Sequence, residues 1–421
     1  MSAFDKIIGY EDVKRELRQV ADMIKNFPKY EALGAKMPKG IILHGVPGVG
    51  KTMLAMALIE EVGASNAIIR HEKARDSFCD YIKMTFEAMT IEGEQSIILL
   101  DDLDKFSMEE KNGEEFAVVQ ACIDSVKDKK VFVIATVNDI NLLPKSLTRS
   151  GRFDRNIKVG HPVGEDAVKI ITHYMEGVRV ADDINYEDIA KMLTGRSCAT
   201  LESVINRAAI EAAFEGKENI EMKDFIKATL TDVYGLENRC GELSIEKQEE
   251  IAYHEAGHAV IAEVLMPGYI GMVSLSSDMF SGMGGFALRC KEPERRAYEI
   301  LVALGGKAAC EMKYGRIASG TGSDFEDAIH NLLQSISRVG SAGFNHLEMP
   351  HTSDSESYIS NREQVVYSEL ERYLFKAKEI IAENREFLDK VAKELLEKHT
   401  LLYSDMKRIR ESCTITPAVV G

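Results

Sequence analysis

The segment His254-Glu255-Ala256-Gly257-His258 places two imidazoles and a carboxylate on one turn of a predicted helix, flanked by apolar residues at helical spacing. Side chains four residues apart lie on the same helical face, so His254 and His258 can bind one Zn²⁺. Glu255 can take a proton from a water molecule whose pKa zinc lowers to about 7. Gly257 costs about 1 kcal/mol relative to alanine in a helix interior, which indicates that another backbone approaches this turn. The pattern predicts catalytic zinc acting on a carbonyl; the alternative is a chance match on a buried helix.

A second motif, G-x-x-x-x-G-K-T at residues 45–52, has the spacing of a phosphate-binding loop. It stands between a predicted strand at Ile41–Leu43 and a predicted helix that begins near Met53. Glycines allow backbone N–H groups to surround phosphates, Lys51 would reach the β and γ oxygens, and Thr52 would bind Mg²⁺. The alternative is a glycine-rich turn without a ligand. The predicted nucleotide-binding residues of this loop are Gly45, Val46, Pro47, Gly48, Val49, Gly50, Lys51, Thr52 and Met53.

Two further apolar runs of strand length end in polar residues that could serve the same nucleotide. Ile97–Leu100 leads to Asp101 and Asp102, and we expect this strand to lie next to the phosphate-loop strand and to hold Mg²⁺ through water. Val131–Thr136 leads to Asn138, whose amide could sense the γ-phosphate. Together with the phosphate loop, these residues predict an ATP site at one edge of a parallel sheet.

Three arginines lie within seven residues of the polar loop 149–155. In a monomer this would be a solvated basic loop. In a ring of subunits, Arg152 and Arg155 could reach the neighbouring ATP site and stabilise transition-state charge as arginine fingers. The nucleotide motifs that precede the loop favour the ring.

Composition narrows the class of protein. A chain of 421 residues can form two or three domains. Its 52 basic and 68 acidic side chains give a net charge of −16, which argues against nucleic acid as the main partner. Seven cysteines without a C-x-x-C pair indicate free thiols in a reducing compartment. Since no apolar run reaches 18 residues and no signal pattern opens the sequence, we expect a cytoplasmic chain without a membrane span.

Taken together, these motifs resemble the FtsH-type family of AAA+ zinc metalloproteases, and the resemblance covers nearly the whole chain. Ala252–Ala259 is highly specific to the family's peptidase domain, and Lys378–Arg385 is similar to its C-terminal helices. The resemblance implies Zn²⁺, ATP and Mg²⁺ as cofactors, protein substrates, and a ring of six identical subunits. It also implies roles for single residues: Ile8 and Gly9 at the start of the ATPase domain, Arg152 and Arg155 as arginine fingers, His173 beside the adenine, and Gly195, Ser197 and Ala199 in a lid near the nucleotide.

A catalytic zinc needs a third protein ligand, for which the residues alone leave several candidates. Asp324 follows a glycine-rich turn and begins an amphipathic helix, where an aspartate is also common as a helix cap. The resemblance selects Asp324, because Thr321–Asp324 is similar to the family loop that carries the third ligand. The other candidates between residues 260 and 360 are several glutamates and Asp278, Asp327, His330, His346, His351 and Asp354.

The sequence departs from the family's pattern in three places. The family's strand ends in Asp-Glu, whereas Asp102 stands here in the second position and is one methylene shorter, so hydrolysis could be slow or water-bridged. The region His71–Cys79, where the family has an aromatic pore loop, is charged, and Phe78 is its nearest aromatic residue. Most members begin with membrane spans, so this chain is either a soluble variant or lacks a removed membrane segment.

The predicted fold is an α/β, P-loop AAA+ nucleotide-binding domain with a helical lid, followed by a mainly α-helical zinc metallopeptidase domain. The expected domains are residues 1–160, 161–238 and 239–413, with a polar link at residues 237–242. Gly271–Leu288 is either a strand-like edge beside the zinc, to which a peptide could add as a strand, or a flexible loop. We expect Gly305 and Gly306 to mark close packing, and residues 350–360 to form a mobile loop. Strands are predicted near Ile41, Ile68, Ile97, Val131 and Ile157.

The leading hypothesis is an ATP-dependent zinc protease that unfolds proteins through a ring and hydrolyses their peptide bonds. One alternative is a remodelling ATPase or chaperone with a structural zinc, although a structural site has no need of Glu255. Another alternative is an ATP-independent zinc peptidase on a ring that binds nucleotide but barely hydrolyses it. The shorter side chain of Asp102 is consistent with this alternative.

Overall fold

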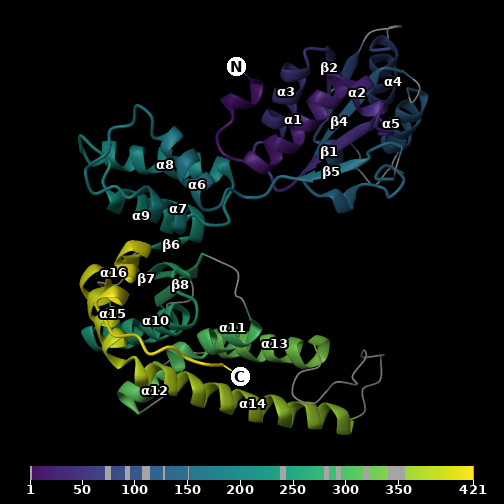
Figure 1. The fold of residues 1–421 in the computed structure, drawn as a ribbon. Helices are drawn as coiled ribbons and strands as arrows, with labels where there is room; N and C mark the ends of the chain where they lie inside the picture. The colour runs from purple at the N-terminus through teal and green to yellow at the C-terminus, as the bar shows by residue number, and fades with distance from the viewer. Residues whose placement is uncertain are drawn as a thin grey trace. The chain divides into compact units, whose positions relative to one another are not determined.

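The computed structural model describes residues 2–71, 77–90, 95–106, 114–126, 129–149, 151–237, 243–278, 284–290, 295–315, 322–339 and 356–420. The chain divides into two compact units (Figure 1). The first unit comprises Met1–Val178 and Gly195–Ser203, and the second comprises Arg179–Thr194 and Val204–Gly421.

A five-stranded parallel sheet in the order β2-β3-β4-β1-β5 forms the centre of the first unit. The strands read as continuous apolar runs because helices cover both faces of the sheet. All five predicted strands are confirmed. They are β1 (Gly40–His44), β2 (Ser65–Arg70), β3 (Ser96–Asp101), β4 (Val131–Val137) and β5 (Arg155–Lys158).

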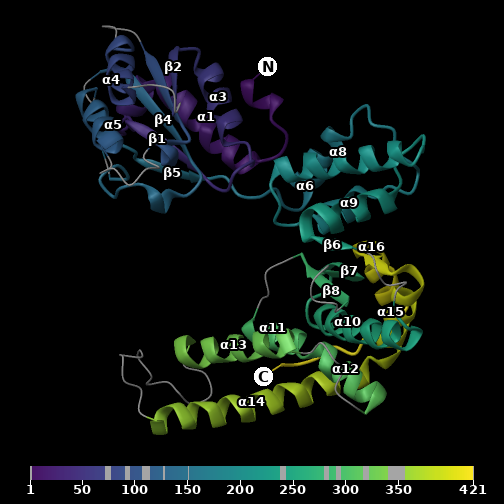
Figure 2. The same ribbon diagram turned by 180° about the vertical axis from the view of Figure 1, so that it is seen from behind.

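Of the helices of this unit, α1 and α3 pack on one face of the sheet and α4 and α5 pack on the other, as Figures 1 and 2 show from opposite sides. Successive side chains of a strand point to opposite faces, so Ile41 and Leu43 join the core under α1 and α3, while Ile42 joins the core under α4 and α5. The helices are α1 (Glu11–Lys25), α2 (Phe27–Glu31), α3 (Lys51–Val62), α4 (Phe78–Ala88), α5 (Glu114–Ser125) and α6 (Glu165–Tyr174), with short 3₁₀ turns η1 (Ala3–Lys6), η2 (Leu103–Lys105) and η3 (Ile140–Leu142).

The second unit contains α7 (Tyr186–Met192), most of α8 (Cys198–Phe214), α9 (Met222–Tyr234) and an antiparallel sheet. Strand β7 (Ile270–Asp278) pairs with β6 (Leu236–Glu237), β8 (Gly284–Arg289) and β9 (Thr400–Leu402). The predicted strand structure of Gly271–Leu288 is therefore confirmed at β7 and β8, while residues 279–283 lie outside the described ranges. Within those ranges β8 pairs with β7 alone, so β8 is an edge strand.

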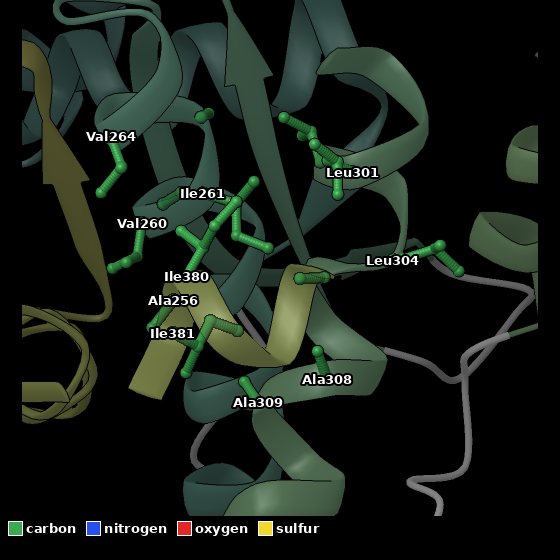
Figure 3. Close-up of a cluster of buried hydrophobic side chains, with 14 of the residues drawn as sticks. Ala256, Val260, Ile261, Val264, Leu301, Leu304, Ala308, Ala309, Ile380 and Ile381 are labelled. Carbon is green, nitrogen blue, oxygen red and sulfur yellow. The ribbon is translucent and has the colours of Figure 1, made fainter. Parts of the chain in front are cut away.

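Helix α10 (Ile245–Leu265) runs through the core of the second unit. Its apolar side chains pack among those of α11 (Arg296–Ala303), α12 (Gly305–Tyr314) and α14 (Glu356–Glu383), as Figure 3 shows around Val260 and Ile261. The remaining helices are α13 (Gly322–Val339), α15 (Arg385–Lys398) and α16 (Tyr403–Glu411).

Two predicted loops lie partly outside the described residues. The prediction of a loop at residues 350–360 is wrong for Glu356–Ser360, which belong to the first turns of α14, and residues 350–355 lie outside the described ranges. Of the predicted polar link, Glu237 lies in β6, and residues 238–242 are likewise outside them. Among the described residues, no helix is long and apolar enough to cross a bilayer.

Candidate zinc and nucleotide sites

Two imidazole nitrogens and one carboxylate oxygen converge where α10 faces the first turn of α13. The Nε2 atoms of His254 and His258 lie 3.1 Å apart, because a spacing of one helical turn brings the two rings together edge-on. Oδ2 of Asp324 lies 3.0 Å from Nε2 of His254 and 3.3 Å from Nε2 of His258. Among the described residues, these three form the one such group of possible metal ligands. The structure thus brings together all three residues that the sequence proposed as ligands.

The geometry of this group fits zinc. Ligand atoms in a tetrahedral site with bonds of 2.0–2.1 Å lie about 3.3 Å from one another, close to the separations found here. Nδ1–H of His258 donates a hydrogen bond of 2.6 Å to the carbonyl oxygen of Val302, which directs the lone pair of Nε2 toward Asp324. Burial raises the pKa of Asp324, but its hydrogen bonds to both histidines outweigh burial and hold that pKa well below its ordinary value. Two imidazoles and an ionised carboxylate are a zinc-type donor set.

Glycines at the crossing of α10 and α12 make room for this group. A β-carbon at Gly257 would lie 2.4 Å from the carbonyl oxygen of Gly305, and one at Gly305 would lie 2.6 Å from that of Gly257. A β-carbon at Gly306 would lie 2.4 Å from Cε1 of His254. The backbone approach expected at Gly257 is therefore confirmed, and so is the expectation that Gly305 and Gly306 mark close packing.

Glu255 lies beside the three ligands and against the edge strand β8. Its side chain is buried, and a β-carbon at Gly285 would lie 2.6 Å from its Oε1, so only a glycine leaves space for the carboxylate there. Burial raises the pKa of Glu255, and the nearby histidines oppose that rise without cancelling it. A raised pKa suits a group that accepts and returns a proton near neutral pH.

The phosphate loop joins β1 to α3, as its sequence requires. Gly48 and Gly50 have φ of +78° and +92°, values that favour glycine. The ammonium of Lys51 donates hydrogen bonds to the carbonyl oxygens of Gly45 at 2.7 Å and Val46 at 3.0 Å, and to Oδ1 of Asn138 at 2.8 Å. The loop therefore holds Lys51 directly beside the amide that was expected to sense the γ-phosphate.

Asp101 sits behind this loop in a dense set of hydrogen bonds. Its Oδ1 accepts from Oγ1 of Thr52 at 2.8 Å and from Oγ1 of Thr136 at 2.7 Å, and its Oδ2 accepts from Arg70 at 2.8 Å. The expectation that its strand lies next to the phosphate-loop strand is wrong, because β4 stands between β3 and β1. Asp101 still reaches Thr52, which donates to its Oδ1 directly, and Thr136 of β4 donates to the same oxygen.

Asp102 follows in a left-handed conformation with φ of +55°, which turns it away from the strand. Its backbone N–H donates to Oγ1 of Thr136 at 2.8 Å, and its carboxylate accepts from Asn138 at 3.3 Å and from Lys105 at 2.6 Å. The carboxylate in the position of the family's glutamate is therefore paired with a neighbouring ammonium.

Two cavities of the first unit open on the phosphate loop. The first, of about 400 Å³, is lined by Pro47, Gly48, Gly50, Lys51, Thr52, Met53, Asp102, Lys105, Asn138, Tyr174, Cys198, Ala199 and Glu202. The second, of about 290 Å³, is mainly apolar and is lined by Lys6, Ile7, Ile8, Tyr10, Val49, Gly50, Met53, Leu54, Ile170, His173, Tyr174, Cys198 and Glu202. The predicted nucleotide residues that line neither cavity are Gly9, Gly45, Val46, Asp101, Gly195 and Ser197.

Sequence reasoning missed Tyr174, Cys198 and Glu202, which line both cavities. Their signal in the sequence was weak, because they come from α6 and α8, far along the chain from the phosphate loop. The close approach of α8 to the loop brings Cys198 and Glu202 there: the N–H of Ala199 donates to the carbonyl oxygen of Gly48 at 3.1 Å.

The two predicted arginine fingers differ in their surroundings. Arg152 forms a bidentate pair with Asp124, at 2.9 Å and 2.7 Å, and also donates to the carbonyl oxygen of Ser146. Arg155 begins β5, and within the described ranges its side chain makes one hydrogen bond, a long one of 3.4 Å to Gln19. Arg152 is thus held by its own subunit, whereas Arg155 has a side chain with more freedom to move.

Phe78, the aromatic residue closest to the expected pore loop, belongs to the core. It is 8% exposed and packs edge-on against Phe106 and His71, so it offers no exposed ring to a substrate. Residues 72–76 of that region lie outside the described ranges.

Comparison with protein families identifies three matches along the chain. Residues 41–161 match the ATPase family associated with various cellular activities (AAA), residues 183–227 match the AAA+ lid domain, and residues 289–409 match peptidase family M41. They follow one another in the order expected from the sequence.

Several proteins named ATP-dependent zinc metalloprotease FtsH are similar to nearly the whole of this chain. An ATP-dependent zinc metalloprotease FtsH of Leptotrichia buccalis is 30% identical over 96% of this chain and 56% of its own, and one of Rhodothermus marinus is 28% identical over 96% and 63%. The FtsH protein of Lachnoclostridium phytofermentans is 30% identical over 96% of this chain and 74% of its own. The chain thus spans between about half and three quarters of the length of these relatives. With an AAA domain, its lid and an M41 peptidase domain in one polypeptide, the chain belongs to the FtsH family of AAA+ zinc metalloproteases.

Proposed function

We propose that the chain is an ATP-dependent metalloendopeptidase that uses Zn²⁺, ATP and Mg²⁺. The observation that carries the proposal is the convergence of His254, His258 and Asp324 within 3.0–3.3 Å of one another, beside the buried carboxylate of Glu255. Bound zinc would supply Lewis acidity to a peptide carbonyl and to water. The family relationship supports the same activity and protein as the substrate.

In the peptidase domain, Glu255 is the proton carrier. It takes a proton from the attacking water and returns it to the leaving amine, for which its raised pKa is suited. His258 is held in one tautomer by Val302, so its Nε2 stays directed at the site. The edge strand β8 runs past Glu255 at Gly285, and an extended peptide that adds to this edge would lie along the catalytic group.

In the ATPase domain, the phosphate loop binds the nucleotide. When nucleotide binds, Lys51 would exchange the carbonyl oxygens of Gly45 and Val46 for the β and γ phosphates, and Thr52 and Asp101 would hold Mg²⁺. Asp102 orients the attacking water, and Asn138 links Asp102 to Lys51. Ile8 and His173 line the apolar cavity, which takes the adenine.

We further propose that six chains form a closed ring in which Arg155, together with Arg152, completes the ATP site of the neighbour. The working domains are residues 1–160, 161–238 and 239–413. Hydrolysis in the ring unfolds a protein and moves it toward the zinc, with residues 72–76 as the region to search for the substrate-gripping loop.

A pair of substrates tests this function. The chain should degrade a casein-like unfolded protein, and a tightly folded protein only when ATP is present. Equal degradation of the unfolded protein with and without ATP, and none of the folded one, would favour an ATP-independent peptidase, which the Asp102–Lys105 pair would then explain. ATP hydrolysis without any proteolysis would indicate a remodelling ATPase.

A further inference from the structure

The two cavities beside the phosphate loop share one wall. Their common lining consists of Gly50, Met53, Tyr174, Cys198 and Glu202. The larger cavity carries the cationic and polar groups of Lys51, Thr52 and Lys105, which suit phosphates and Mg²⁺. The smaller is lined mainly by aliphatic side chains such as those of Ile7 and Leu54, which suit the face of a base.

A nucleotide that spans both cavities has its sugar at the shared wall. The sugar is the covalent link between the base and the phosphates, so it must lie where one cavity passes into the other. Within that wall Glu202 contributes the one carboxylate. A carboxylate accepts hydrogen bonds, and the two neighbouring hydroxyls of ribose donate them.

Glu202 is held in place by the start of α8. It lies one helical turn after Cys198, on the same face of the helix. That first turn is fixed to the phosphate loop, since the N–H of Ala199 donates to the carbonyl oxygen of Gly48, and a β-carbon at Gly48 would lie 2.8 Å from Cβ of Ala199. The distance between the Glu202 backbone and the phosphate loop is therefore fixed.

The carboxylate of Glu202 is available for a ligand. In the described part of the chain it accepts no hydrogen bond and forms no ion pair, whereas the neighbouring Cys198 thiol already contacts the hydroxyl of Tyr10 at 3.3 Å. Burial, with smaller contributions from Cys198 and Glu202, raises the pKa of Tyr174, which places the Glu202 charge close to the shared wall.

We propose that Glu202 accepts hydrogen bonds from the ribose hydroxyls of the bound nucleotide and thereby makes the site selective for ribonucleotides over 2′-deoxyribonucleotides. The inference rests on the proposed nucleotide binding and adds a specificity-determining residue to it. The charge also disfavours a nucleotide with a 2′-phosphate.

Calorimetric titration of the full chain with Mg²⁺ and either ADP or 2′-deoxy-ADP tests the proposal without hydrolysis. A hydrogen bond to a charged acceptor predicts that the wild type binds ADP about tenfold more tightly than 2′-deoxy-ADP. Glu202→Ala should reduce this ratio to less than about twofold while leaving the affinity for 2′-deoxy-ADP nearly unchanged, which also shows that the pocket is intact. Titration with 3′-deoxy-ADP divides the effect between the two hydroxyls.

Glu165→Gln is the matched control, because its side chain lies on α6, is 91% exposed and lines neither cavity. It should keep the tenfold ratio. A wild type that binds both nucleotides equally, or a Glu202→Ala variant that keeps the ratio, would overturn the role of Glu202 and leave nucleotide binding intact. A wild type that binds neither nucleotide would contradict the proposed function itself, and this inference with it.

Discussion

Gly306 lies directly against the imidazole of His254. A β-carbon at this position of α12 would lie 2.4 Å from Cε1 and 2.5 Å from Nδ1 of that ring, and also 2.5 Å from Nε2 of His258. Real β-carbons do not approach other atoms so closely, so the two candidate zinc ligands keep their positions only while a glycine faces them from α12.

Gly306→Ala should therefore displace both imidazoles and weaken zinc binding by about 10–100-fold, the range observed when residues that orient metal ligands are changed. Zinc content after dialysis against a weak chelator measures the effect. Gly315→Ala is the control for a general loss of stability, because Gly315 ends the same helix with φ of +66°, which alanine disfavours, but has no atom within 4 Å of its missing β-carbon. Equal zinc retention in the two variants would show that the site tolerates a side chain at Gly306.

Gly257→Ala tests whether α10 and α12 are in backbone contact, because the substitution should change the stability of the protein in opposite directions with and without that contact. Helix propensity alone predicts that alanine stabilises the protein by about 1 kcal/mol. The contact with the Gly305 carbonyl predicts instead a loss of about 1–3 kcal/mol, because the helices must separate. Urea unfolding, followed by the helical signal of the second unit, distinguishes the expected gain in stability from the expected loss. An increase in stability would mean that the helices are not in backbone contact.

The residues that carry the chemistry of this chain could be predicted from its sequence, whereas the residues that pack against them could not. The His254–His258 pair and the phosphate loop were found because short spacings determine which side chains share a helical turn or a strand-to-helix junction. The order of parallel strands does not follow the order along the chain, so the separation of β3 from β1 by β4 could not be read from the sequence. Neither could the contact of Gly306 with His254, since it joins two helices whose crossing depends on the whole core.

The nucleotide site shows the same limit. Glu202 reaches the shared wall of the two cavities only because α8 packs on the phosphate loop, and nothing in its local sequence marks it. Asp324 is an intermediate case, because its position at a helix start could be predicted from the sequence, but several other acidic residues and histidines remained candidates until a family resemblance selected it.

Asp102→Glu should speed ATP hydrolysis, because the added methylene gives the carboxylate the reach that the family uses. Asp102→Asn should instead reduce hydrolysis by about 10²-fold, as expected when a proton-accepting group is removed, while nucleotide still binds. Phosphate release at saturating ATP measures both variants. An unchanged or lower rate for Asp102→Glu would mean that the surroundings, including Lys105 and Asn138, have adapted to aspartate. Lys51→Ala, which should not bind nucleotide, gives the background.

Arg155→Ala should reduce ATP hydrolysis by about 10³-fold or more and leave ATP binding largely intact, because a finger acts on the transition state of the neighbouring site. Mixing Arg155→Ala with Lys51→Ala subunits should restore some activity, since one supplies the phosphate loop and the other the finger. Normal hydrolysis by Arg155→Ala, together with a monomer at micromolar concentration with ATP, would contradict the ring.

Arg152 requires a separate test because it is paired with Asp124 within its own subunit. If its main role is to hold the loop, Asp124→Asn should reproduce the loss seen in Arg152→Ala. If it acts on the neighbour's ATP, Arg152→Ala should reduce hydrolysis far more than Asp124→Asn. Comparing the two hydrolysis rates at equal ring content, measured by sedimentation, decides between these roles.

The most direct test of the zinc protease is a joint measurement of metal content and casein cleavage in the wild type and in Glu255→Gln. We predict about one zinc per subunit in both proteins, because the ligands His254, His258 and Asp324 are unchanged, and cleavage in the wild type alone, because only the proton carrier is removed. Full cleavage by Glu255→Gln, or a wild type that cleaves casein without binding zinc, would contradict this account.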